Sequence, residues 1–146
     1  RHDYSEPCDL LIDLAGVGCN TELSMDALFV RAQERAVILP LYLYDHSGIT
    51  MNTTGFHCPW DSGQVGWIHV SLAPIRDEFQ IKRVTRIVRD GVADQLRQEV
   101  GTYDHYLTGN CYGFVVEKDG EQIDSCWGFL GDYDDYCLEE AKASVV

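Results

Sequence analysis

Apolar residues recur with helical spacing directly after Ser24. The repeat consists of Met25, Leu28, Phe29 and Ala32. Steps of three and four residues place these side chains on one face of a helix, and serine is a preferred residue at a helix N-cap. The pattern therefore predicts an amphipathic helix from residue 25 to about residue 35, with one face packed on a sheet.

A longer helical stripe follows Pro74. Its apolar members are Val84, Ile87, Val88, Val92, Leu96 and Val100. Basic residues fall largely on the other side, at Lys82, Arg83, Arg86, Arg89 and Arg97. We expect a core-facing helix with a basic outer face. Arg83, Arg86 and Arg89 could receive an anionic ligand or an acidic partner, although such a stripe is more often a solvated helix face.

Two segments have the pattern of strands. Residues 37–44 are nearly all apolar, as expected for a strand covered on both faces. Pro40 costs this strand one hydrogen bond, so we expect it beside an edge or a bulge. Residues 65–72 resume the strand pattern. In the N-terminal segment 1–22, a short apolar run followed by Gly16 and Gly18 predicts a short strand or turn.

The clearest structural signal is the dipeptide Asp119-Gly120, which suits the two-residue turn of a β-hairpin. This turn would pair Lys118 with Glu121 and Tyr112 with Trp127. One buried face of the hairpin would then hold Tyr112, Phe114, Val116, Ile123 and Trp127. In the same register Cys111 and Cys126 would be diagonal neighbours at about 7–8 Å, which is marginal for a disulfide.

Residues 45–64 have the composition of a loop, with four glycine or proline residues at Gly48, Gly55, Pro59 and Gly63. Loops of this length in a compact domain are usually functional or disordered. Phe56 and Trp60 argue against disorder. We therefore expect an ordered loop whose two aromatic side chains insert into the domain.

Together these patterns predict one α+β domain over residues 1–146. We expect an antiparallel or mixed sheet of about four or five strands, two main helices packed on one face, and a short helix from residue 136 to about residue 143. No stretch approaches the roughly 20 apolar residues of a membrane span, and the first residues lack the apolar core of a signal peptide. We expect a soluble, cytoplasmic protein.

The net charge of −13 is unevenly distributed, with −6 over residues 1–75, +2 over residues 76–98 and −9 over residues 99–146. An acidic surface repels phosphates, so we expect no direct binding of free nucleic acid. It could attract a basic protein groove, or it could serve solubility alone. The residues that we expect at a protein contact are Asp132, Asp134, Asp135, Glu139, Glu140 and Trp60, with Glu117, Asp119, Glu121 and Asp124 as further candidates.

The loop also brings a thiol, an imidazole and carboxylates into one segment. Cys58 with His46, oriented by Asp45 or Asp61, would form the nucleophile pair of a small hydrolase or transferase. Its pocket would be walled by Tyr44, Trp60 and Trp67. In the competing interpretation the aspartates and serines cap turns and Cys58 is buried.

Residues able to bind a metal are present without a recognised spacing. They are His46, His57, Cys58, Asp61, His69 and His105. We therefore predict neither a metal site nor a cofactor. The six cysteines include no Cys-x-x-Cys pair, so we expect free thiols, several of them buried.

Residues 41–51, 58–66, 102–109 and 123–129 resemble small acidic proteins carried by bacteriophages, plasmids and integrative elements. The resemblance spans roughly residues 37–140. It implies an accessory role, such as countering a host defence nuclease, and supplies no catalytic residues. We therefore predict a protein-binding, anti-defence inhibitor of the anti-CRISPR or anti-restriction type, whose acids mimic nucleic acid in the groove of a host protein. A small Cys–His hydrolase or transferase is the alternative.

Overall fold

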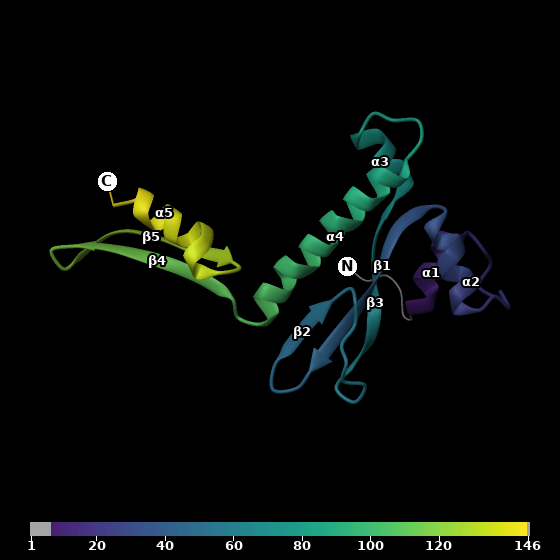
Figure 1. Ribbon diagram of the computed structural model, residues 1–146, viewed down its shortest axis with the longest axis horizontal. Helices are drawn as coiled ribbons and strands as arrows, with labels where there is room; N and C mark the ends of the chain where they lie inside the picture. Colours follow the sequence, from purple (N-terminus) through teal and green to yellow (C-terminus); the bar gives the residue numbers. More distant parts are fainter. Residues whose placement is uncertain (1–6, 146) are drawn as a thin grey trace.

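The computed structural model describes residues 7–145, apart from the side chains of Pro7 and Asp135. Its helices are α1 (Pro7–Ala15), α2 (Met25–Gln33), α3 (Leu72–Glu78), α4 (Arg86–Leu107), the π-helix η1 (Tyr133–Cys137) and α5 (Leu138–Ala143). Its strands are β1 (Ala36–Asp45), β2 (Ile49–Asn52), β3 (Ser62–Ser71), β4 (Cys111–Lys118) and β5 (Glu121–Leu130). We call residues 7–107 the body and residues 108–145 the arm (Figure 1).

The described strands form two antiparallel sheets, one of three strands in the order β2-β1-β3 and one made of the β4–β5 hairpin. The predicted α+β class is confirmed, but one sheet of four or five strands is not found. The reason is that α4 separates β4 from β3 in space as well as in sequence, and the hairpin stands at the far end of this helix (Figure 1).

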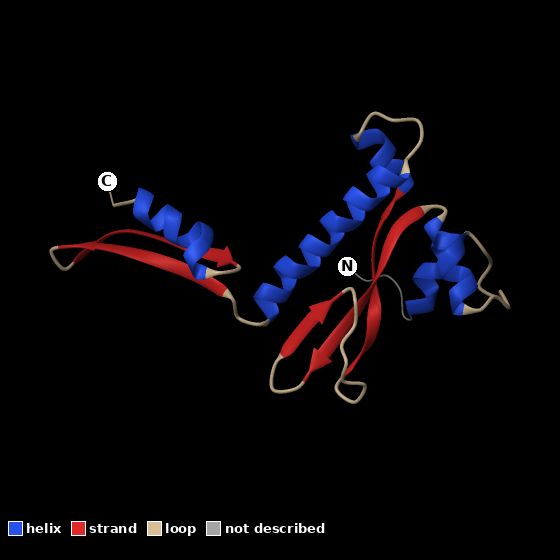
Figure 2. Ribbon diagram, viewed as in Figure 1, coloured by secondary structure: helices blue, strands red, loops and turns tan. Residues whose placement is uncertain are grey.

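Helices cover both faces of the body sheet, with α1 and α2 on one side and α3 and α4 on the other (Figure 2). The expectation that the main helices share one face was therefore wrong. The cause lies in β1, where the neighbours Val37 and Ile38 are both buried. Adjacent strand residues point to opposite faces, so an apolar strand of this kind needs a helical layer on each side.

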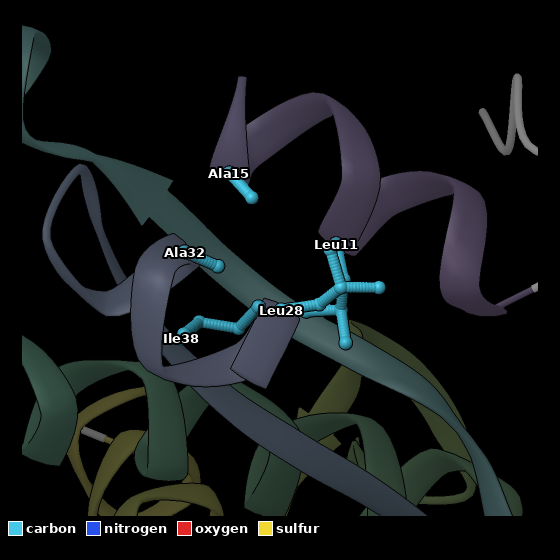
Figure 3. Close-up of a cluster of buried hydrophobic side chains, with 5 residues drawn as sticks. All are labelled: Leu11, Ala15, Leu28, Ala32 and Ile38. Atoms are coloured by element: carbon cyan, nitrogen blue, oxygen red, sulfur yellow. The ribbon is translucent and has the colours of Figure 1, made fainter. Parts of the chain in front are cut away.

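The first apolar core lies between α1, α2 and β1 (Figure 3). It consists of the buried residues Leu11, Ala15, Leu28, Ala32 and Ile38. At its edge, the rings of Phe29 and Trp67 stack with centroids 4.9 Å apart. The predicted helix after Ser24 is confirmed, and the Ser24 hydroxyl accepts a hydrogen bond from the backbone N–H of Ala27. Residues 7–15 form α1 rather than a strand or turn, because Leu11 and Ala15, one helical turn apart, face α2.

The second core lies on the other face of the sheet. Its buried residues are Val37, Leu72, Ile75, Val92 and Leu96. The predicted helical stripe is confirmed for Val92, Leu96 and Val100, which are buried in α4. Ile87 was wrongly placed on it, since this side chain is 83% exposed on the first turn of α4.

The segment predicted as a loop contains a strand. Residues 49–52 form β2, which pairs with β1 from Tyr42 to Asp45, so the connection without regular structure shortens to residues 53–61. Pro40 lies opposite Trp67 of β3, beyond the end of β2 and next to the register shift at Leu41/Tyr42. Its missing N–H therefore falls at a locally unpaired edge beside a bulge, as the sequence predicted.

The arm is a β-hairpin covered on one face by η1 and α5 (Figure 1). Lys118 lies opposite Glu121, which confirms the predicted turn. Its apolar centre is small, with Val116 and Cys137 as the buried residues and Phe114, Phe129 and Tyr136 in ring contact around them. None of the helices in the described range 7–145 is long and apolar enough to cross a membrane.

Candidate functional site

The hairpin carries an exposed apolar face. Directly opposite residues of an antiparallel pair share a face. Trp127 lies opposite Gly113, and Tyr112 lies opposite Phe129. Tyr112 and Gly113 are consecutive, so Tyr112 and Trp127 are on opposite sides of the hairpin. The predicted common face is therefore wrong, and Trp127 is 72% exposed on the side that η1 and α5 leave open.

β5 contains two irregularities, and the one nearer the turn, at Ile123, moves Trp127 to the other face. The register shifts once between Val116 and Glu117, where Ile123 is left without a partner, and again between Tyr112 and Gly113, where Gly128 is left without one. Each extra residue exchanges the faces of the residues that follow. Gly128 has φ +99°, a conformation that favours glycine. The same shifts place Cys111 opposite Leu130 and Cys126 opposite Phe114, on opposite faces, so these thiols are not the diagonal neighbours that were predicted.

Gly113 gives the Trp127 ring its position. A Cβ atom at residue 113 would lie 2.3 Å from Cε3 of Trp127 and 2.8 Å from the Cys126 carbonyl oxygen. The indole therefore occupies the space that the Cβ atom of any other residue at position 113 would fill. Val115 and Leu130 are exposed on the same face. We call Val115, Trp127 and Leu130 the outer face of the arm.

Acidic residues surround the outer face without forming one patch. Glu117 lies on the outer face, Asp119 and Glu121 lie at the hairpin tip, and Asp132, Asp134 and Glu139 are exposed on the η1 and α5 side. These acids therefore do not share one face of the arm. The Asp135 side chain lies outside the described residues. The Glu140 carboxylate accepts a hydrogen bond from the Tyr136 hydroxyl and raises its pKa above the ordinary value.

The loop of residues 53–61 carries the second exposed tryptophan. Trp60 is 91% exposed, so the expectation that it inserts into the domain was wrong. Phe56 does pack inward, with its ring 5.5 Å from that of Tyr44. One aromatic side chain is enough to hold the loop on the sheet, and Trp60 is left as a candidate contact residue on the body.

The arrangement of the candidate catalytic residues Cys58, Asp61 and His46 does not suit nucleophilic catalysis. The Cys58 thiol donates a hydrogen bond to Oδ2 of Asp61 at 3.5 Å, and Nδ1 of His46 lies 3.3 Å from the same oxygen. The carboxylate thus separates the thiol from the imidazole. Activation of a thiol requires the base itself within hydrogen-bond reach. Asp45 joins this group through its backbone N–H, which donates to the Asp61 carbonyl, while its side chain is exposed.

A hollow of about 580 Å³ opens beside this loop. Its lining comes from Tyr42, Thr54, Gly55, Phe56, His57, Pro59, Ser62 and Gly63. Neither Cys58 nor His46 lines it, and the predicted walls are absent too, because Trp67 packs on Phe29 and Trp60 faces solvent. The hollow and the thiol are therefore separate features.

The possible metal ligands do not converge. Within residues 7–145 no group of three or more histidine, cysteine, aspartate or glutamate side chains could hold a metal ion. His69 is half-buried in β3, where burial lowers its pKa and the charge of Asp13 partly opposes that shift. All six cysteines are free thiols as predicted, but among them only Cys137 is buried.

The predicted basic face of α4 is partly occupied by structural contacts. Arg89 donates hydrogen bonds to the carbonyl oxygens of Gln33 and Ala36, at 2.9 and 3.3 Å, and so fixes α4 to the end of α2. Arg97 pairs with Asp94 on its own helix. Arg86 is largely exposed, with Asp90 at 3.7 Å. Of the three arginines considered for an anionic ligand, Arg89 is therefore already engaged.

Sequence reasoning missed the outer face because it assigned Trp127 to the buried side. The available signal was the glycine at position 113 in an otherwise apolar strand, since glycine inside a strand often marks close approach of another group. Comparison with known proteins adds no second line of evidence: no protein-family model, curated protein or solved structure matches this chain.

Proposed function

We propose that this chain is a protein-binding factor that docks through the outer face of the arm onto a basic partner. The observation that carries the proposal is the position of Trp127, an exposed indole that packs against Gly113, with Val115 and Leu130 exposed on the same face. Tryptophan is among the residues most enriched at the energetic centres of protein interfaces. A ring whose position is already set loses little conformational freedom on binding.

The burial of β5 supports the same proposal. Of its ten residues, all but Phe129 are exposed. The apolar side chains of Ile123, Trp127 and Leu130 therefore remain in contact with water in the isolated chain. Contiguous exposed apolar surface on a folded protein marks interaction sites. A partner that covers the outer face would bury Trp127 and Leu130.

Charge defines the class of partner. Residues 108–146 contain nine carboxylates against two lysines, so two copies of the arm would repel each other. A basic surface would be attracted, and the spread of acids around the rim suits a partner groove that encloses the arm. A nucleic-acid-binding protein offers such a groove. The resemblance to proteins of mobile elements leads us to propose a host defence protein of this kind, inhibited by occupation of its groove.

A site-specific crosslinking experiment tests this function. A photo-reactive amino acid is placed at Val115 on the outer face and, as a matched control, at Val30, an exposed apolar residue of α2. We expect a defined adduct with a basic protein from position 115 and none from position 30. Binding of that purified partner should weaken at least about tenfold on Trp127→Ala substitution.

Two outcomes would reject the proposal. Adducts that form equally from positions 115 and 30 would show no preference for the outer face. Full binding by the Trp127→Ala variant, with loss of binding on Trp60→Ala, would move the contact to the loop on the body. That second result would still be consistent with a basic partner, but it would reject the arm as the docking element.

A further inference from the structure

A second hollow lies on the body between α3 and α4. Figure 1 shows α3 beside the end of α4 that is remote from the hairpin. The volume of the hollow is about 290 Å³, which lies at the lower end of the range of small-molecule pockets and has room for an aliphatic side chain. Its floor consists of Val70, Ile75, Val92 and Leu96, and Phe79 forms one wall. We call this hollow the α3–α4 groove.

The mouth of the groove is acidic. Glu78 of α3 and Glu99 of α4 line it, together with Gln95. Both carboxylates are exposed, and neither makes an ion pair with any other described residue. An apolar floor under two unpaired carboxylates fits an aliphatic group with a cation beside it.

The chain itself carries a group of that chemistry. Ile87 is 83% exposed at the start of α4, more than any other aliphatic side chain among the described residues. Arg86 precedes it, with Asp90 at 3.7 Å, and Arg83 lies four residues before it in the non-helical segment that leads into α4. This segment of residues 83–87 combines an unburied aliphatic side chain with two cations, which is the complement of the α3–α4 groove.

We propose that the α3–α4 groove of one copy binds Ile87 of a second copy, with Arg83 and Arg86 of that copy against Glu78 and Glu99. The groove and Ile87 are different surfaces of the molecule, so the contact is heterologous and can continue from copy to copy. The net charge of −13 opposes association at long range. At physiological salt that repulsion is screened beyond about 8 Å, while charges in direct contact are screened far less. The interface is independent of the proposed docking of the arm.

Sedimentation of the full chain tests the proposal directly. Between about 10 µM and about 1 mM, the range expected for a contact built on one apolar side chain, we expect the sedimentation coefficient to rise with concentration. Ile87→Ala should lower the association constant at least about tenfold, since it removes most of the apolar side chain that becomes buried. The matched control is Val30→Ala, which shortens another exposed apolar side chain and should leave association unchanged.

Two charge-reversal variants distinguish this specific contact from nonspecific association. One variant carries Glu78→Lys with Glu99→Lys, and the other carries Arg83→Glu with Arg86→Glu. Each variant alone should be monomeric, because groove and inserted segment then have the same charge. Their mixture should associate, because each variant offers what the other lacks. Acids at the first turn of α4 are compatible with the helix dipole, and circular dichroism confirms folding. A chain that stays monomeric at all concentrations, or a mixture that fails to associate, would overturn the proposal.

Discussion

Asp104 of α4 accepts a hydrogen bond from the hydroxyl of Thr50, with 2.7 Å between the two oxygen atoms. The same carboxylate oxygen accepts a second hydrogen bond, also at 2.7 Å, from the backbone N–H of Met51. Thr50 and Met51 belong to β2, an edge strand of the body sheet. Since edge strands present unpaired backbone groups that invite aggregation, the helix both covers this edge and satisfies one of its donors.

We expect Asp104→Ala to lower the free energy of unfolding by about 2–3 kcal/mol, because it leaves two partly buried donors without their charged acceptor. Asp104→Asn keeps an acceptor oxygen and should cost less. Asp90→Ala is the control on the same helix, where an exposed pair with Arg86 should contribute well under about 1 kcal/mol. Urea denaturation measures all three variants. Equal effects of the Asp104 and Asp90 substitutions would contradict this account of the β2 edge.

How far the sequence predicts this fold depends on whether the signal is local. The helix behind Ser24, strand β1 and the turn at Asp119-Gly120 were predictable, because each is determined by spacing or turn chemistry within a few residues. The contact between Asp104 and Thr50 joins positions 54 residues apart, and no local sequence pattern predicts it. Strand β2 has only four residues, too few for alternation to stand out between glycines.

The candidate site shows the same limit. Its turn was predicted correctly, yet one extra residue in β5, Ile123, moved Trp127 to the other face. Such irregularities depend on packing by η1 and α5, which the hairpin sequence does not contain. The two-sided burial of β1 was different, since the apolar run predicted it directly. The expectation that both main helices pack on one face was inconsistent with this prediction of two-sided burial.

Gly113→Ala should destabilise the arm by about 1–3 kcal/mol, because the added methyl group meets the Trp127 ring and the Cys126 carbonyl. Hydrogen exchange of the β4 and β5 amides would detect the change locally. Gly101→Ala provides the contrast: a Cβ atom there has no atom within 4 Å, and replacing glycine inside a helix should stabilise α4 by up to about 1 kcal/mol. If both substitutions change stability in the same direction, the close contact at Gly113 does not contribute to the stability of the arm.

His69 should make stability depend on pH. Its pKa is lowered from the ordinary 6.5 mainly by burial, with the charge of Asp13 opposing in part. The unfolded chain therefore binds the proton more tightly than the folded chain. The free energy of unfolding is therefore highest above pH 6.5, the pKa of the unfolded chain. It falls as the pH drops from there through the lower folded-state pKa, and it levels off below that value. We expect His69→Gln to flatten this part of the profile in urea titrations between about pH 8 and about pH 5. An unchanged slope would assign the dependence to other groups.

Cys58 provides a test of the alternative enzymatic function. In the structure its thiol donates to Oδ2 of Asp61, and Nδ1 of His46 approaches that same oxygen rather than the sulfur. A thiol activated by an imidazole reacts faster with alkylating agents and loses that advantage when the imidazole is removed. We therefore expect His46→Ala to leave the rate at which iodoacetamide alkylates Cys58 within about twofold of the original. Asp61→Asn, which changes the direct partner of the thiol, should alter that rate more.

Peptide mapping by mass spectrometry separates Cys58 from the exposed Cys19, Cys111 and Cys126, which act as internal references. A fall of tenfold or more for His46→Ala, about the loss expected when an activating base is removed, would restore the Cys–His pair and with it the case for a hydrolase or transferase.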